Sequence, residues 1–247
     1  MKRKTIEGFE HFLSIEDSHL SDTVEFLGKD YRLILDLDSL YFSCLKIALP
    51  ADDTLVIPAF LYLISHQEFY YGMAAFLRRH KAQAFRCLRA ALDSTFAAYY
   101  LLKNPDETEQ FLTKNVSSSM GENRFRNLKA TIKNNRKMFP LAGGLIKVHD
   151  LCSKFSHADP ESIFHKYFLD RDDMVLHVKY FDYEKKPGDY KRWYAFLLFH
   201  FFRVFLIYWN EMLRKDAGAM KREIAQLVAD YDARIHAYRK KYPVSFF

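Results

Sequence analysis

The chain has 247 residues, of which 49% are hydrophobic and 28% charged, with a formal net charge of +6. This balance excludes a disordered chain and supports a sizeable buried core. The three cysteines, Cys44, Cys87 and Cys152, are widely spaced in apolar surroundings, which favours free thiols in a reducing compartment over a disulfide framework. No apolar run follows the basic N-terminus, so no signal peptide is indicated and we expect a cytoplasmic protein.

Apolar residues recur at helical spacing along most of the chain. The first long helix is predicted at residues 29–49. Two antiparallel helices are predicted to follow at 57–79 and 81–103, joined by a tight polar turn. The first half of the chain is therefore expected to be helical throughout.

The later elements are shorter and more varied. Helices are predicted near 122–137 and 141–157, and the β-branched and aromatic residues of 174–184 predict a strand or hairpin. An apolar helix at 191–215 and an amphipathic helix at 221–242 complete the pattern.

Together these elements predict an all-α protein. We expect one domain, residues 1–247, built as a bundle of about six or seven helices with one small β excursion near 174–184. Only eight Gly and seven Pro are present, and no segment has the composition of a linker. An acidic N-terminal helical segment, residues 1–50, is expected to pack on a core bundle formed by residues 57–247.

The helix at 191–215 has the length and the aromatic ends of a membrane span. However, His200 and Arg203 fall near its middle, and a central Arg costs about 2.5–3.5 kcal/mol on membrane insertion. A central bundle helix explains this pattern better, so we expect no membrane span. Arg203 then needs a carboxylate or carbonyl partner inside the bundle.

Charge is distributed unevenly along the chain. Residues 1–53 contain eleven acids and six Lys or Arg, so this segment has a net charge of −5 and the remainder has +11. Residues 123–149 contain no acid. The cations of this segment are Arg124, Arg126, Lys129, Lys133, Arg136, Lys137 and Lys147. Such a segment attracts RNA phosphates or an acidic protein, and the alternative is a solvated face that serves only solubility.

The common catalytic and cofactor motifs are absent from the sequence. There is no Gly-rich phosphate loop, no Cys-x-x-Cys pair, no His-Glu-x-x-His and no Gly-x-Ser-x-Gly. We therefore expect no cofactor and no bound metal.

Two polar constellations remain, and the first lies in the predicted helix at 81–103. It consists of Arg86, Arg89 and Asp93, of which Arg89 and Asp93 are four residues apart and lie on one helix face. Apolar neighbours surround this pair, so we expect it to be partly buried. It is either an ion pair that also fixes a neighbouring helix, or an Arg held by a carboxylate and able to bind an anion.

The second constellation lies around LCSKFSHADPES, residues 151–162. At 100° per residue, Asp150, Ser153 and His157 fall nearly in one line on a helix. A His one turn from a Ser can act as a general acid or base near pH 7. In the alternative, His157 only marks the helix end, because Pro160 prevents the helix from continuing.

These two stretches together resemble a loose pattern in bacterial helical proteins. HKAQAFRCLRAALDSTFAAYYLL has an Arg before an acid, and LCSKFSHADP, some fifty residues later, has a Ser and a His before a Pro. Over residues 57–160 the pattern is distantly similar to the HEPN superfamily, small helical bundles of toxin, abortive-infection and defence systems, many of which cleave RNA. The chain departs from that pattern with Asp93, where the acid is usually Glu, and with Ala158 after His157.

The resemblance also implies candidate catalytic residues. HEPN ribonucleases carry an Arg followed, after four to six residues, by a His, and the match here is Arg171 with His177. His177 lies in the strand-like MVLHVKYF rather than in a predicted helix. The resemblance therefore implies a metal-independent endoribonuclease in which His157 or His177 is the acid or base and Arg89 or Arg171 holds the phosphate.

Three classes of function follow from these patterns. We expect a non-catalytic binding or regulatory module, of bacterial defence or toxin type, whose contact surface is the basic segment and the region from Arg89 to His157. The ribonuclease is the alternative. The third class is a scaffold subunit that associates through its aromatic helices, for which Arg203 and the C-terminal helix would be the informative residues. A homo-oligomer is expected in any case.

Overall fold

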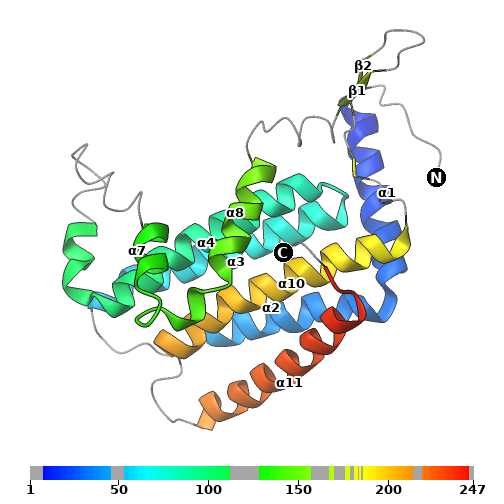
Figure 1. Cartoon of the computed structure of the whole chain (residues 1–247). Helices are drawn as coiled ribbons and strands as arrows, with labels where there is room; N and C mark the ends of the chain where they lie inside the picture. The colour runs from blue at the N-terminus through cyan, green and yellow to red at the C-terminus, as the bar shows by residue number, and fades with distance from the viewer. Residues whose placement is uncertain are drawn as a thin grey trace.

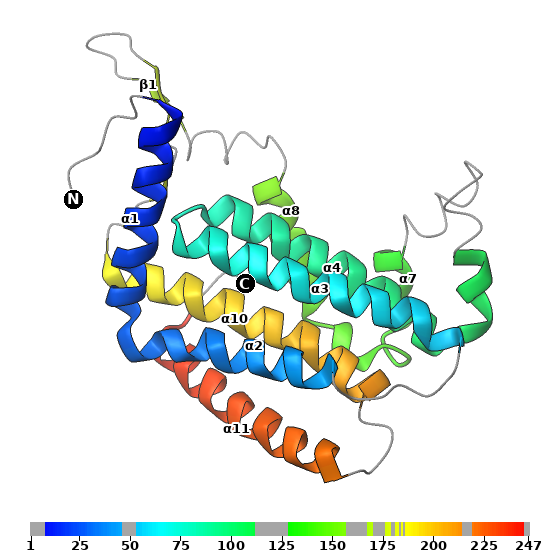
Figure 2. The same ribbon diagram turned by 180° about the vertical axis from the view of Figure 1, so that it is seen from behind.

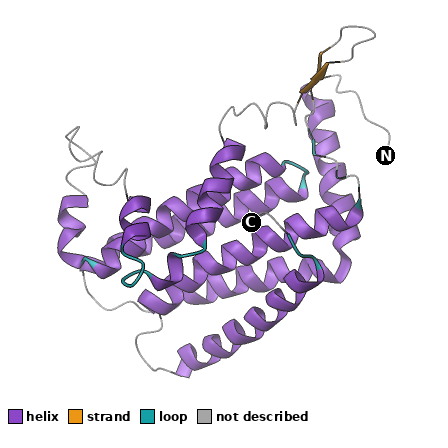
Figure 3. Ribbon diagram, viewed as in Figure 1, coloured by secondary structure: helices purple, strands orange, loops and turns teal. Residues whose placement is uncertain are grey.

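The computed structural model describes most of the chain, and nearly all of the described part is helical (Figure 3). The described residues are 8–45, 53–111, 128–156, 167–169, 176–178, 181–182, 184, 186–213 and 219–244. Eight α-helices have bounds within them: α1 (Phe9–Leu27), α2 (Arg32–Leu45), α3 (Asp53–Leu77), α4 (Lys81–Lys103), α7 (Leu128–Asn134), α8 (Leu145–Ser156), α10 (Pro187–Tyr208) and α11 (Ala219–Lys241). The predicted all-α class is confirmed.

Two helices occupy the acidic N-terminal segment, where the sequence analysis singled out one long helix. Gly28 has a φ of +52°, a left-handed conformation that glycine adopts at low cost, and it ends α1. A 3₁₀ turn, Gly28–Tyr31, leads directly into α2. Because of this break, α1 runs across one end of the bundle while α2 lies along it (Figure 1).

The helices α3 and α4 form the predicted antiparallel hairpin. Arg79, in the turn between them, has a φ of +68°. Asp182, far away in the sequence, fixes this turn: its backbone N–H donates to the Arg79 carbonyl, and its carboxylate accepts from the Lys81 backbone N–H, both at 2.8 Å. The carboxylate thus satisfies one of the N–H groups that every helix start leaves without an intrahelical partner.

The helix α4 is the middle layer of the molecule. It packs against α3 on one side and against α7 and α8 on the other. Figure 2 views the molecule from the α3 side, with α7 and α8 behind α4. The outward faces of α3 and of the α7–α8 layer therefore point in opposite directions.

The centre of the bundle is α10, which contacts α2, α3, α4, α8 and α11. Its aromatic side chains, among them Phe201, Phe202 and Phe205, are fully buried. Among the described residues, Pro187–Leu213 is one helical stretch long and apolar enough to cross a membrane, but 78% of its apolar window is buried within the bundle. This burial is that of a core helix, as predicted.

Arg203, in the C-terminal half of α10, has the carbonyl partner that its burial was predicted to require. Its Nη2 donates to the Leu141 carbonyl at 3.2 Å. Its Nη1 lies so close to Gly144 that a Cβ at that position would meet it at 2.6 Å. A side chain at position 144 would therefore require the Arg203 guanidinium to shift.

The helix α11 covers α10 and α2 with an apolar stripe and leaves a polar face outside. Its buried side chains are Ile224, Val228, Tyr231, Ile235 and Tyr238. The apolar side of the C-terminal helix is thus used within the chain itself.

Two three-residue strands form an antiparallel pair beyond the end of α1 (Figure 1). They are β1 (Tyr167–Leu169) and β2 (Leu176–Val178), with Phe168 opposite His177. The sequence placed a β excursion near 174–184; β2 falls in that range, β1 lies upstream of it, and Phe181 and Asp182 are in irregular structure.

Candidate functional site

The segment from α7 to α8 forms a layer on the side of α4 opposite to α3. Leu128 and Ile132 of α7 are buried, and α8 buries Leu145, Val148 and Cys152. These residues recur at helical spacing and line the inner side of the layer. Lys133, Lys147 and Lys154 are exposed, so the outer side of the layer carries charge.

That outer side is strongly basic. Residues 128–156 contain six Lys or Arg and a single acid, Asp150. We call the surface formed by the six cations the α7–α8 face: Lys129, Lys133, Arg136, Lys137, Lys147 and Lys154. All of them except Lys129 are exposed.

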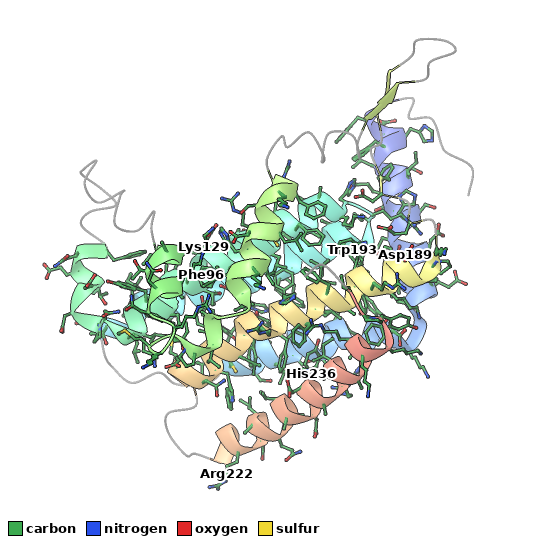
Figure 4. All side chains as sticks on the ribbon, in the orientation of Figure 1. Phe96, Lys129, Asp189, Trp193, Arg222 and His236 are labelled. Carbon is green, nitrogen blue, oxygen red and sulfur yellow. The ribbon has the colours of Figure 1, made fainter. Side chains whose placement is uncertain are left out.

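Lys129 is bound to the one acid of this face. Its Nζ donates to Oδ1 of Asp150 at 2.5 Å, so that α7 is tied to α8 where Lys129 points between the two helices (Figure 4). Partial burial acts to raise the pKa of Asp150, but the hydrogen bond and charge of Lys129 outweigh it and the pKa is lowered. Asp150 is therefore ionised at neutral pH and neutralises Lys129.

Four other cations of the face have no ion pair with any residue that the structure describes. They are Lys133, Arg136, Lys137 and Lys154. Each is exposed, so each charge is hydrated and available to an anion at little desolvation cost.

The two polar constellations from the sequence meet at a third residue, His149. Its Nε2 lies 2.8 Å from Oδ1 of Asp93, and Oδ2 of Asp93 lies 3.8 Å from Nε of Arg89. The expected contact between Arg89 and Asp93 on α4 is thus present, and it connects to α8. On the other side, His149 Nδ1 lies 3.8 Å from Oδ1 of Asp150.

This arrangement connects two helices of the bundle. His149 is only 7% exposed, and each of its ring nitrogens faces a carboxylate. Its contact with Asp93 bridges α8 and α4. Ser153 donates its hydroxyl hydrogen to the His149 carbonyl at 2.8 Å, a bond within α8. Asp150 and Ser153, which the sequence grouped with His157, therefore have other partners.

Several predicted site residues lie outside the described residues: Arg124, Arg126, His157 and Arg171. The backbone of His177 lies in β2, as its strand-like sequence indicated. Arg86 is exposed on α4 and has no ion pair within the described part of the chain.

His149 was not among the predicted site residues, although the sequence contains a signal for it. His149 lies three residues after Ile146 and three before Cys152, and both of these are buried. A histidine within an apolar stripe is expected to be buried and to need a polar partner. The identity of that partner, 56 residues away on another helix, depends on the packing of α8 against α4.

Among the described residues, no group of three or more His, Cys, Asp or Glu side chains is arranged to hold a metal ion. No family model matches the chain, and neither a curated protein nor a solved structure matches it. The similarity to HEPN proteins therefore stays a prediction, and function has to be argued from the chemistry of the surface.

Proposed function

We propose that this protein is a binding module that takes an anionic polymer, RNA in the first instance, on its α7–α8 face. The observation that carries the proposal is the set of four exposed cations that have no ion pair with any described residue, Lys133, Arg136, Lys137 and Lys154, on one layer that contains a single acid. The HEPN-like pattern adds a bacterial defence or toxin setting. A cytoplasmic location belongs to the same proposal, and the three buried free cysteines support it.

The chemistry of the face favours contacts with phosphates over contacts with bases. Phe139, the aromatic residue nearest to Arg136 and Lys137 in the described sequence, is only 1% exposed and packs against Tyr99 and Tyr100. It is therefore not available to stack on a base. Lysine and arginine contacts to phosphates fix position but carry no sequence information, so binding is expected to tolerate many sequences.

The test is the affinity for labelled single-stranded RNA across a series of salt concentrations, measured by fluorescence anisotropy. We expect log K to fall linearly with log salt, with a slope of about −0.7 for each phosphate contact. A Lys133→Glu, Arg136→Glu double variant should lose at least two such contacts, so the slope should weaken by about 1.4. Its affinity at low salt should fall at least tenfold.

The matched control is Lys240→Glu with Lys241→Glu, which makes the same change in net charge at exposed positions of α11. This variant should bind RNA nearly as the wild type does. Equal losses in the two double variants would show that only net charge matters and would overturn the α7–α8 face as the site. If RNA does not bind but polyglutamate does, and Lys133→Glu abolishes that binding, the partner is an acidic protein.

The ribonuclease alternative is tested with the same purified protein and the same labelled RNA. RNA is incubated with the wild type in the presence of a chelator, beside the His157→Ala, His177→Ala and Arg89→Ala variants with unchanged melting temperatures. Cleavage that one folded variant loses would make the protein an enzyme and identify the residue. Intact RNA in every sample supports the binding module.

Self-association, which the sequence analysis expects, is proposed to use a different surface. Two copies that met through their α7–α8 faces would bring like charges together, and such contacts are unfavourable. The side of the molecule on which α3 lies carries no Lys or Arg on that helix and is the surface proposed here.

A further inference from the structure

The composition of α3 does not fit its position in the fold. Asp53 and Glu68 are the only residues with acidic side chains among its 25 residues, and it contains no Lys or Arg. A helix that is apolar nearly all round is normally covered on all sides. In the part of the chain that the structure describes, however, one side of α3 is open to solvent (Figure 2).

The open side of α3 consists almost entirely of large apolar and aromatic side chains. They are 42–59% exposed: Val56, Phe60, Leu63, Ile64, Tyr70 and Tyr71. Asp53 and Gln67 are the other exposed residues of this helix. A helix face that only contacts solvent normally carries charged residues, which keep a protein soluble. The apolar composition of this side of α3 is therefore not that of a solvated surface.

The helix α2 extends this surface. Leu35, Phe42 and Leu45 are 39–53% exposed and recur at helical spacing. Tyr70 of α3 donates its hydroxyl hydrogen to Oδ1 of Asp38 at 2.6 Å, and the same oxygen lies 3.2 Å from His66 Nε2, so the two open sides adjoin. We call these nine side chains the α2–α3 face.

The exposed area of this face is large enough for a stable interface. Four of its side chains are rings, Phe42, Phe60, Tyr70 and Tyr71, which are 53, 59, 47 and 57% exposed. Counting roughly 200 Å² for a whole aromatic side chain, these rings alone leave about 400 Å² uncovered. The five aliphatic residues bring the face toward the roughly 800 Å² per partner that a standard interface buries.

We propose that the α2–α3 face is the interface of a two-fold symmetric dimer of this chain. An interface of this kind requires that residue i meets residue j of the second copy and j meets i. Six of the eight exposed positions of α3 have this property for two antiparallel helices whose axis passes between Leu63 and Ile64. Leu63 then meets Ile64, Phe60 meets Gln67, and Val56 meets Tyr71, so an exposed residue of one copy lies opposite an exposed residue of the other.

The charge of the face also favours a second copy over a nucleic acid or an anionic lipid surface. A nucleic acid or an anionic lipid surface would be recognised by Lys and Arg, which α3 lacks. Two copies of α3 bring no cations together, and the Asp38 carboxylate is already engaged by Tyr70 and His66.

The test begins with the mass of the wild-type protein in solution, measured by light scattering after size exclusion and by sedimentation. We expect twice the 29.3 kDa of one chain. Leu63→Glu places two carboxylates next to the axis and should weaken dimerisation by about 30-fold or more, as loss of an interface hot spot does. Because Leu63 is 45% exposed in one chain, the variant should retain its circular dichroism spectrum as a monomer.

The matched control is Leu227→Glu, which makes the same change at a residue of α11 that is 51% exposed. It should leave the dimer intact. A wild type that stays monomeric at the highest concentration reached would overturn the proposal, and so would a dimer that Leu63→Glu leaves intact.

The register of the helices can be tested by cross-linking. The three native cysteines are buried, so introduced thiols react selectively with a short bis-maleimide. A Val56→Cys, Tyr71→Cys protein should cross-link between copies. Val56→Cys alone should not, because at 1.5 Å per residue its two thiols would lie about 22 Å apart along the helices. Cross-linking of both proteins to the same extent would overturn the antiparallel arrangement.

The variants that test dimerisation and RNA binding lie on different faces, so the failure of one proposal can be distinguished from the failure of the other. The Lys133→Glu, Arg136→Glu variant should remain a dimer, and Leu63→Glu should still bind RNA as a monomer with a reduced apparent affinity.

Discussion

The α2–α3 face and the α7–α8 face lie on opposite sides of α4 and differ in every property that decides what they bind. The first has nine exposed apolar side chains and no Lys or Arg on its long helix, whereas the second has six cations and one acid. An ordinary solvated helix is available for reference in α11, where Arg222, Glu223 and Asp230 are all exposed, and Figure 4 shows Arg222 pointing away from the bundle. Neither face resembles it, so the two faces are expected to bind partners of different kinds: an anionic polymer at the α7–α8 face and an apolar surface at the α2–α3 face.

The opposite placement of the two faces has a geometric consequence. If two copies pair through α3, both α7–α8 faces point away from the axis, one on each side of the dimer. One RNA long enough to reach both would bind with higher apparent affinity than either face alone provides. The contrast between the faces thus predicts a bivalent protein.

The largest expected effect separates the inner side of α3 from its outer side. Phe69 and Phe60 lie on the same helix, but Phe69 is fully buried and Phe60 is 59% exposed. Phe69→Ala should lower the free energy of unfolding by about 3–5 kcal/mol, through lost burial and an unfilled cavity. Phe60→Ala should change it by no more than about 0.5 kcal/mol.

Both changes in unfolding free energy would be measured by urea unfolding, at a protein concentration low enough to keep the chain monomeric. Equal losses in the two variants would mean that Phe60 is packed within the chain, and the outer side of α3 would then not be an open face.

A smaller effect is expected from a histidine in the core, and it appears in the pH dependence of stability. His200 of α10 is 4% exposed, and burial, together with the charges of Arg203 and Arg239, holds its pKa well below the usual value. Its unfolded pKa lies near 6.5, so below that pH the unfolded chain binds a proton that the folded chain does not. Stability is therefore complete above about pH 6.5 and should fall at lower pH, by about 1 kcal/mol at pH 5.5.

His200→Gln removes this titration. The difference in unfolding free energy between pH 7.5 and 5.5 should be smaller in the variant than in the wild type. Identical differences would show that the folded chain protonates His200 as readily as the unfolded chain does. Burial also lowers the pKa of His66, so part of the pH dependence should persist in the variant.

Much of the fold was readable from periodicity, and the failures have local causes. The hairpin at 57–79 and 81–103 and the core helix at 191–215 were predicted correctly because long apolar stripes and a polar turn mark them. The helix predicted from residue 29 begins directly after Gly28, but α1 before it was not predicted as an element of its own.

The candidate site was predictable in its charge but not in its contacts. Residue counts alone located the basic surface around Lys133 and Arg136. The carbonyl partner of Arg203 was predicted as a necessity, because a buried guanidinium needs one. That Asp93 meets His149, rather than a residue of the Ser153–His157 stripe, depends on how two helices are rotated against each other, and the sequence of neither helix specifies that alone.

The smallest expected effect concerns the acid of the α7–α8 face. Asp150 is the one acid of the α7–α8 face, and it neutralises Lys129. Asp150→Asn should therefore increase RNA affinity a few-fold and steepen the salt slope by about 0.7, the value for one additional phosphate contact. The stability lost should stay below about 1 kcal/mol, because the Asp150 side chain is 57% exposed and solvent screens the pair.

The pH dependence of this change has a definite sign. The pKa of Asp150 is lowered in the folded chain, so its contribution is present above its unfolded pKa, about 3.9, and is lost as pH falls through the folded value. The stabilities of Asp150→Asn and the wild type should therefore differ at pH 7 and converge in acid. Asp230→Asn, the same change on the mixed face of α11, is the control and should leave the RNA salt slope unchanged. Weaker RNA binding by Asp150→Asn would mean that the carboxylate itself contacts the ligand, and the face would then suit a partner that presents cations as well as anions.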